Sequence, residues 1–344
     1  MDASGTAGPS PAVDVETIRL QAEEHPLIED TPPASPAEHC LRLVHLRAYD
    51  EAVAHAAGRD VLDVGCNTGY GTVRFLPVAR RVVGVDVSVR AIEAARRRAP
   101  SGQPDFILSS GFALPFPDDS FDLVSSFQVL EHVPDPIAYL RETARVTRPG
   151  GEVILATPNA AIRLDPGMTP WNRFHVHEYV AAELRDLLVR VFPQVRVRGL
   201  FGTPTLYETE IRRVDAARQR IRRKNEAARQ AEAHQAEAHN AATRRATGKV
   251  DRAARPLPIR VARRVLPSAM RRWLRSTVAP TPSPTVRSIP EAAPPPQPPP
   301  GTPEMDLASF LEFSVTDLFY ADTDLDRAMD LLAICQVGEP LPTA

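Results

Sequence analysis

Lysine is almost missing from this chain of 344 residues, in which Lys224 and Lys249 are the two lysines and arginine supplies the other basic side chains. Cysteine is also scarce. Its three scattered residues argue against a disulfide framework and fit a reducing compartment. Runs of about 18 apolar residues do not occur, so we expect no transmembrane helix. The first residues lack a basic stretch followed by an apolar one, so we expect no signal peptide and a cytoplasmic protein.

Arginine and proline are abundant and unevenly distributed. Residues 206–275 hold 19 Lys or Arg against 7 Asp or Glu, while the rest of the chain is net acidic. We divide the chain by composition into five parts. These are a disordered tail at 1–35, a core at 36–205, a basic helical insertion at 206–278, a Pro-rich linker at 279–305, and a strand and a helix at 306–340 that return to the core.

Short apolar segments alternate with helical patterns through the core. We expect a first helix from Ser35 to Gly58, then strands at 61–64, 82–85, 106–108, 121–127, 152–156 and 195–200, with helices at 69–76, 88–98, 136–147 and 180–191. The strands are apolar throughout, as parallel strands buried on both faces are. This alternation predicts a Rossmann-like, doubly wound α/β fold with a mostly parallel, seven-stranded sheet.

The remainder of the chain supplies the last strand of that sheet. Residues 208–249 favour a long solvated helix, and residues 256–274 read as two short basic amphipathic pieces. Residues 307–320 alternate like a strand, and residues 325–335 carry apolar side chains at helical spacing. We expect residues 310–315 or their neighbours to pair beside strand 195–200, which makes the basic region an insertion before the last strand.

The stretch from Val61 to Gly71 organises the core. Four apolar residues of a buried strand run into a turn that contains Gly65, Gly69 and Gly71. Such a turn brings backbone N–H groups close to an anionic ligand group at a helix N-terminus. A second strand ends in Asp86, whose carboxylate can accept both hydroxyls of a ribose. Because Ser88 follows as a helix cap, Asp86 could instead belong to that cap.

Five short motifs follow one another along the core. They occupy residues 61–69, 83–86, 114–122, 129–132 and 148–151. The set resembles class I S-adenosylmethionine-dependent methyltransferases of the small-molecule branch (type 11, ubiquinone–menaquinone-like), over about residues 38–200. Residues 174–179, with Glu183 and Leu184 behind them, look like methyltransferases of sugar, polysaccharide or natural-product pathways.

The resemblance implies S-adenosylmethionine as the cofactor. In its pattern Asn67 stands where the family usually has a third glycine, and Asn tolerates left-handed backbone. Asp63 would hold the methionine ammonium or cap the turn, and Ser110 stands where the family often has an aspartate for adenine. Phe112 would stack or simply pack. The expected cofactor residues are Asp63, Gly65, Cys66, Asn67, Gly69, Asp86, Val87, Ser110, Gly111, Phe112, Phe127 and Gln128.

Histidines are the candidates for the chemistry of transfer. If the acceptor is a hydroxyl, a base helps, and unperturbed histidine side chains change charge near neutral pH. The candidates are His132, His175 and His177. The alternative for each is a hydrogen-bonded structural histidine. We expect no metal site, because no third ligand clusters in sequence with His175 and His177.

These residues predict an enzyme that methylates an oxygen of a sugar, glycan or secondary metabolite. The alternative is a protein of the same fold that is tethered to an anionic membrane or partner surface by its basic insertion, with binding as its main role. Residues 206–275 would then contact a membrane surface, the domain itself or a second subunit. We expect no nucleic-acid partner, because the segment after the fourth strand lacks the Pro-Pro-aromatic motif of many base methylases.

Overall fold

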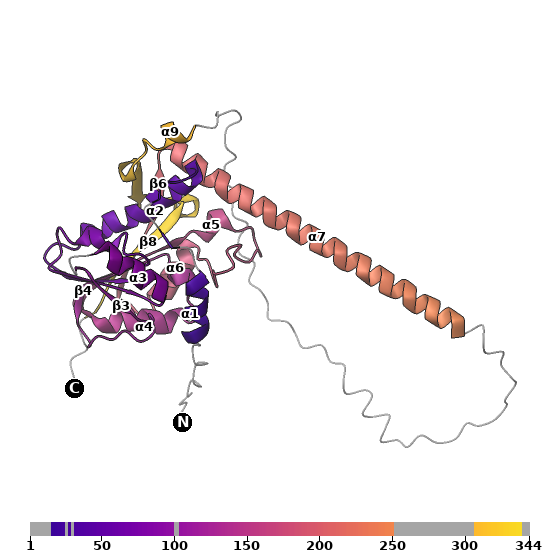
Figure 1. Ribbon diagram of the computed structural model, residues 1–344, viewed down its shortest axis with the longest axis horizontal. Coiled ribbons are helices and arrows are strands. Elements are labelled where there is room, and N and C mark those ends of the chain that lie inside the picture. The colour runs from indigo at the N-terminus through magenta and orange to yellow at the C-terminus, as the bar shows by residue number, and fades with distance from the viewer. Residues whose placement is uncertain (1–14, 25–26, 29–30, 100–102, 251–305, 339–344) are drawn as a thin grey trace, which may run out of the picture. The chain divides into compact units, whose positions relative to one another are not determined.

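A computed structural model describes residues 15–24, 27–28, 31–99, 103–250 and 306–338. Its centre is an eight-stranded sheet with the order β3-β2-β1-β4-β5-β8-β6-β7 (Figure 1). The strands are β1 Asp60–Val64, β2 Arg81–Asp86, β3 Asp105–Leu108, β4 Phe121–Phe127, β5 Thr147–Pro158, β6 Gln194–Gly202, β7 Leu318–Ala321 and β8 Asp330–Gln336.

The strands from β3 to β5 pair in parallel, and the C-terminal strands make the sheet mixed. β1 pairs in parallel with both β2 and β4, β2 with β3, and β4 with β5. β8 runs antiparallel between β5 and β6, and β7 is antiparallel to β6. The Rossmann-like α/β prediction is therefore confirmed, with one strand more than the seven expected.

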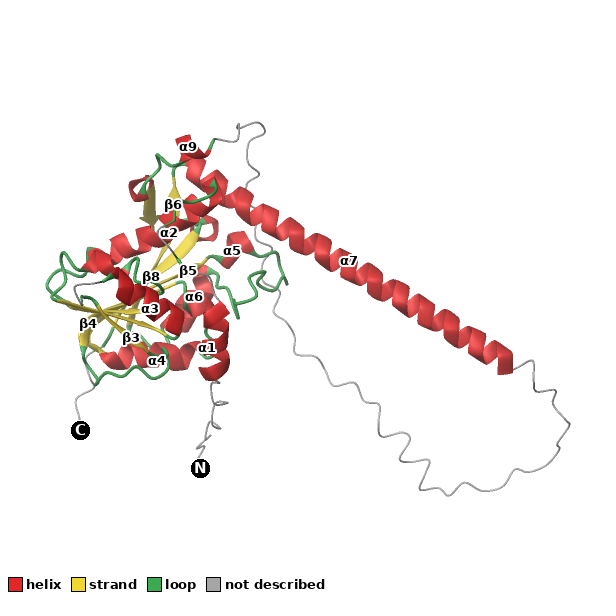
Figure 2. Ribbon diagram, viewed as in Figure 1, coloured by secondary structure: helices red, strands yellow, loops and turns green. Residues whose placement is uncertain are grey.

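Helices cover both faces of the sheet (Figure 2). They are α1 Val15–Glu24, α2 Pro36–Val53, α3 Val89–Arg98, α4 Pro136–Val146, α5 Ala160–Arg163, α6 Ala181–Leu188, α7 Pro204–Val250 and α9 Leu307–Phe310, with 3-10 turns at Thr72–Phe75, Leu130–His132, Val315–Asp317 and Leu325–Arg327. Ser35 and Ser88 cap α2 and α3 as the sequence predicts. The helix expected at 69–76 is only the 3-10 turn at Thr72–Phe75.

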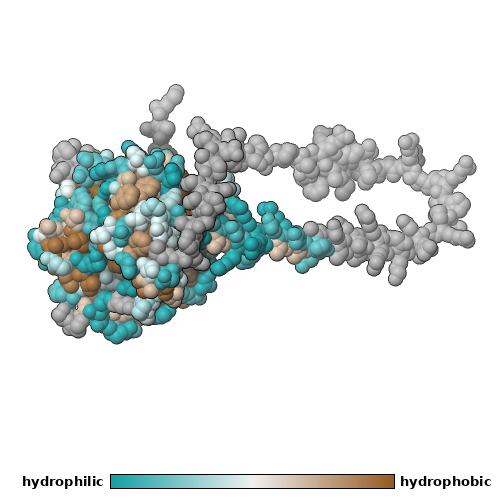
Figure 3. Space-filling view, turned by 90° about the horizontal axis from the view of Figure 1, so that it is seen from above, coloured by the Kyte–Doolittle hydropathy of each residue, from teal (hydrophilic) through white to brown (hydrophobic). Residues whose placement is uncertain are grey.

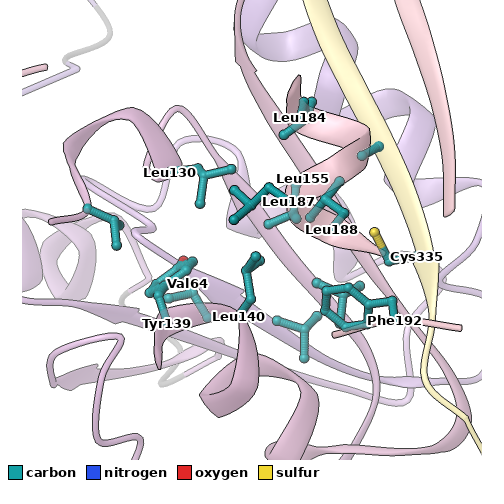
Figure 4. Close-up of a cluster of buried hydrophobic side chains, with 14 of the residues drawn as sticks. Val64, Leu130, Tyr139, Leu140, Leu155, Leu184, Leu187, Leu188, Phe192 and Cys335 are labelled. Atoms are coloured by element: carbon teal, nitrogen blue, oxygen red, sulfur yellow. The ribbon is translucent and has the colours of Figure 1, made fainter. Parts of the chain in front are cut away.

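The core divides between the two faces because successive strand residues point in opposite directions. On one face, Leu62 and Val64 of β1 pack with side chains of α4 and α6 (Figure 4). On the other face, Val61 packs with α2, the start of α7 and α9. Every residue of β1 is buried, which places this strand at the centre of the fold.

The prediction for the C-terminal residues is wrong in the type of the elements and correct in that these residues return to the sheet. Residues 307–320 form the short helix α9, a 3-10 turn and the start of β7, and the expected helix at 325–335 is mostly strand β8. β8 is buried almost throughout, so its apolar run carries no period that separates strand from helix. Residues 310–315 form no strand, and β8 instead pairs along residues 194–200 while β7 pairs with residues 199–202. The chain does return to the sheet after the insertion.

The N-terminal tail is also corrected, because residues 15–24 form α1. Its neighbour Ile28 donates its backbone N–H to the Asn67 side chain and accepts a hydrogen bond from the Thr68 hydroxyl. These contacts tie the segment to the core, and they lie too far apart in sequence for composition to indicate them.

By contacts the chain forms two units, residues 1–221 with 297–344 and residues 222–296. The long helix predicted at 208–249 is α7. Residues 222–232 of α7 are exposed, and they are alanine, amide or charged residues (Figure 3). The basic pieces at 256–274 and the linker at 279–305 lie outside the described residues. Among the residues that the structure describes, none of the helices is long and apolar enough to cross a membrane.

Candidate active site

A pocket opens at the carboxyl ends of β1, β2 and β4. β1 lies between β2 and β4 in the sheet, so the chain reverses its strand order at this point. Open α/β sheets bind ligands in the crevice at such a switch point. The predicted cofactor residues that line the pocket are Gly65, Asn67, Asp86, Val87, Ser110, Gly111, Phe112, Phe127 and Gln128.

The turn after β1 depends on two left-handed residues. Gly65 has a φ of +80°, and a Cβ at this position would stand 2.3 Å from Cγ2 of Val129. Glycine is required there by both the backbone angle and the space. Asn67 has a φ of +48°, as its place in the family pattern suggests, and its Oδ1 accepts from the backbone N–H of Thr68 at 2.8 Å.

Asp86 joins this turn to the next helix. Its carboxylate accepts from the backbone N–H of Asn67 at 2.8 Å and from that of Ser88 at 2.9 Å. The cap of α3 is Ser88, whose hydroxyl accepts from the N–H of Ala91. Burial raises the pKa of Asp86, although these N–H donors oppose the shift. A carboxylate thus lines the pocket at the end of β2.

Three predicted cofactor residues lie behind the pocket wall. Asp63 is fully buried and accepts hydrogen bonds from the hydroxyls of Tyr49, Thr72 and Ser125 at 3.1, 2.6 and 2.9 Å. Burial raises its pKa to about 6. Cys66 packs in the cluster beside α3, and a Cβ on Gly69 would meet the ring of Phe106 at 2.5 Å. These three residues support the turn from below.

The pocket wall after β3 is narrow and partly aromatic. A Cβ on Gly111 would stand 2.3 Å from the ring of Tyr139, so this position requires a small residue. The ring of Phe112 meets that of Tyr139 edge to face, with 6.0 Å between centroids. Tyr139 is fixed by a 2.6 Å hydrogen bond to the Ser126 hydroxyl. Ser110, Gly111 and Phe112 thus line the same pocket as Asp86.

Helix α1 and the residues after it supply an unexpected side of the pocket. Ile18, Ala22, Leu27 and Ile28 line it. The carboxylate of Glu23 accepts from the backbone N–H of Val89 at 2.6 Å and from the Ser88 hydroxyl at 3.1 Å. A helix N-terminus favours such a carboxylate, which fixes α1 against the start of α3.

A histidine follows β4 at the same pocket. His132 lines it, and its Nδ1 lies 2.9 Å from the carbonyl oxygen of Phe174. Burial lowers the pKa of His132, although the Phe174 carbonyl and the Glu178 carboxylate oppose the shift. The preceding Glu131 is buried beneath it and accepts from the Thr157 hydroxyl at 3.0 Å. Burial raises the pKa of Glu131 to about 7.

The other two predicted histidines, His175 and His177, lie in different surroundings. The ring of His175 meets that of His132 edge to face at 4.8 Å, and its Nδ1 lies 2.6 Å from Oε1 of Glu178. Burial acts to raise the pKa of Glu178, but the hydrogen bonds from His175 and Arg163 hold it at about 2. His177 is 48% exposed, and its Nε2 bonds Glu183 at 2.8 Å. Only His175 joins His132.

Comparison with known proteins finds a family model that matches the centre of the chain. The model described as a methyltransferase domain matches residues 62–155, from β1 into β5. Residues 62–155 are thus similar to a methyltransferase domain. The chain has an α/β Rossmann-like fold, with the sheet order described above.

Two curated mycobacterial proteins are similar to more than this domain. A probable S-adenosylmethionine-dependent methyltransferase of Mycolicibacterium smegmatis is 41% identical over 170 residues, which are 49% of this chain and 65% of that protein. The probable S-adenosylmethionine-dependent methyltransferase Rv3030 of Mycobacterium tuberculosis is 39% identical over 171 residues, which are 49% and 61%. The chain thus spans less than two thirds of the length of these relatives. The solved YcgJ protein of Bacillus subtilis matches with a TM-score of 0.41 and 24% identity, over 52% of this chain and 82% of that one.

The methyltransferase domain does not supply the whole pocket. Glu178 and Asp330, which hold His175 and Gln128, come from outside residues 62–155, as does α1. Sequence reasoning missed all three. Glu178 stands three residues after His175, a spacing that could have indicated the pair, whereas Asp330 follows the insertion and has no local signal.

Proposed function

We propose that this protein transfers a methyl group from S-adenosylmethionine to an oxygen of a small acceptor, of the class of a sugar, a glycan or a secondary metabolite. The observation that carries this proposal is the meeting of three features in one pocket. These are the Gly65–Asn67 turn, the Asp86 carboxylate and the ring of His132.

The residues present fit the cofactor. A carboxylate at the end of β2 can accept hydrogen bonds from both hydroxyls of a ribose, and Asp86 is that carboxylate. Ser110, Gly111 and Phe112 line the same pocket and would take the adenine ring. The Gly65–Asn67 turn at the carboxyl end of β1 suits the amino-acid end, where backbone groups bind charge.

S-adenosylmethionine supplies a methyl group on a positively charged sulfur. Transfer by in-line displacement then depends mainly on alignment and on the exclusion of water. Ile18, Leu27 and Ile28 give the pocket an apolar cover that excludes water. His132 and Phe174 form the part of the wall where an acceptor oxygen would lie. The resemblance of residues 174–179 to methyltransferases of sugar, polysaccharide or natural-product pathways favours a hydroxylated acceptor.

Isothermal titration with S-adenosylmethionine tests this proposal. We expect one site in the full chain and a loss of at least about tenfold in affinity for Asp86→Asn, since a hydrogen bond to a charged group contributes about 1.5–3 kcal/mol. Asp105→Asn is the matched control, because Asp105 is exposed at the opposite end of β3. An absence of binding to the wild-type chain, or equal affinity in both variants, would refute the proposal.

A further inference from the structure

Three possible metal ligands meet beneath the wall of the pocket. Glu131, His132 and His175 each offer one ligand atom, and these atoms lie within 4.8 Å of one another. Nε2 of His132 lies 4.0 Å from Oε1 of Glu131. This distance is too long for a hydrogen bond between the two atoms. It is close to the roughly 3.4 Å between two ligand atoms on one ion with bonds of about 2.1 Å.

Both histidines are oriented as metal ligands usually are. Nδ1 of His132 faces the Phe174 carbonyl oxygen at 2.9 Å, and Nδ1 of His175 faces a Glu178 carboxylate oxygen at 2.6 Å. Outer partners of this kind fix the tautomer in which Nδ1 carries the proton and Nε2 is the ligand atom. Glu131 is arranged similarly, because the Thr157 hydroxyl binds its Oε2 and leaves Oε1 to face His132.

The outer partners are themselves held in place. Arg163 donates two hydrogen bonds to Glu178, at 2.8 and 3.0 Å, and both side chains are buried. The backbone N–H of Val176 donates to the carbonyl oxygen of Glu131 at 2.7 Å. This bond fixes the segment that carries His175 against the segment that carries Glu131. The group of three is therefore built by the fold and does not depend on flexible surface side chains.

We propose that Glu131, His132 and His175 bind one divalent cation. Two imidazoles and one carboxylate suit first-row transition metals such as Mn²⁺, Fe²⁺ or Zn²⁺ better than Mg²⁺ or Ca²⁺, which prefer oxygen ligands. The three ligands leave coordination positions open, and His132 lies at the pocket wall, so these positions face the acceptor side.

This inference rests on the proposed function for its role. A cation at this point binds the acceptor hydroxyl and lowers the pKa of that group, as a metal does for bound water. The hydroxyl proton leaves to solvent, the oxygen forms its bond to the methyl carbon, and the carbon–sulfur bond breaks with its electron pair on sulfur. His132 then acts as a ligand, and no histidine base is needed.

The test uses the full chain, stripped with a chelator and titrated with Mn²⁺ or Zn²⁺ alone. We expect one equivalent to bind the wild-type protein. Glu131→Gln and His175→Ala should weaken binding by at least about tenfold, and Glu178→Gln by about 10- to 100-fold. His177→Ala is the matched control, because it removes an exposed imidazole two residues from His175 and should leave the affinity unchanged.

Absence of binding, or equal affinity in Glu131→Gln, His175→Ala and His177→Ala, would overturn the metal site. If the core variants do not fold, Co²⁺ loading of the wild-type chain decides: visible bands of a nitrogen- and oxygen-bound ion are expected, and the spectrum of aqueous Co²⁺ would overturn the proposal. S-adenosylmethionine affinity is measured separately with EDTA present. A chain that binds the cation but not S-adenosylmethionine contradicts the proposed function alone, and the reverse result contradicts the metal site alone.

Discussion

The side-chain amide of Gln128 donates a hydrogen bond to Oδ2 of Asp330, 2.8 Å away and 202 residues further along the chain. Gln128 lines the pocket with a φ of +57°, a left-handed backbone that costs energy in residues with side chains. Asp330 is the first residue of β8, which follows the insertion and lies between β5 and β6 in the sheet. The C-terminal segment thus helps to hold the pocket in shape.

Asp330→Ala should therefore destabilise the protein by about 1–3 kcal/mol, because it leaves the Gln128 amide without its buried acceptor. Asp330→Asn keeps an oxygen for that amide and should cost less. Urea unfolding of the purified variants measures both. Asp326→Ala, at an exposed residue nearby, is the control. Equal midpoints for Asp326→Ala and Asp330→Ala would show that the hydrogen bond contributes nothing.

Asp63 gives a prediction about pH. Its folded pKa, raised by burial to about 6 from 3.8, favours the protonated form in the folded state. The stability that this group contributes is present below about pH 4 and is lost as the pH rises through 6. Relative to Asp63→Asn, the wild-type protein should lose up to about 3 kcal/mol between pH 4 and pH 7. Unfolding curves at both pH values test this, and a constant difference between the two proteins would contradict it.

Gly65→Ala should destabilise the protein by more than about 2 kcal/mol. The substitution adds the cost of a left-handed alanine, about 1–2 kcal/mol, to a collision with Val129. Gly150→Ala separates the backbone strain from the collision. Gly150 also has a left-handed φ of +74°, but an added Cβ there meets nothing within 4 Å. The midpoint of thermal unfolding should be lower for Gly65→Ala than for Gly150→Ala. Adding Val129→Ala to Gly65→Ala should partly restore the lost stability. The reverse order would exclude the collision.

The cover formed by α1 is tested by Ile18→Ala. Ile18 is half-buried in the pocket wall, so the loss of its side chain should cost roughly 1 kcal/mol, or about fivefold in S-adenosylmethionine affinity. Leu20→Ala is the control, because Leu20 lies on the same helix and is 58% exposed. Titration calorimetry compares the two variants, and a larger loss for Leu20→Ala would show that α1 does not cover the bound cofactor.

The sequence predicts the parallel part of the fold well, because β1 and β2 are short apolar runs that lead into a glycine turn and a carboxylate, respectively. It predicts Asp86 and Asn67 for the same local reasons. The errors have a different origin. Leu325, Met329 and Leu332 repeat at helical spacing, yet Leu325 lies in a 3-10 turn and Leu332 lies in β8, where pairing with β5 and β6 decides the structure. The meeting of Glu131 with His175 likewise depends on a backbone hydrogen bond between distant segments.

The central claim is that one pocket holds the cofactor at the Gly65–Asn67 turn and Asp86, with the acceptor beside His132. A crystal structure of the full chain with S-adenosylhomocysteine, the product of methyl transfer, tests it most directly. We predict that the ribose hydroxyls bind the Asp86 carboxylate, the adenine lies along Ser110–Phe112, and the sulfur faces His132. A ligand bound elsewhere, or bound in this pocket with its ribose away from Asp86, would contradict the account.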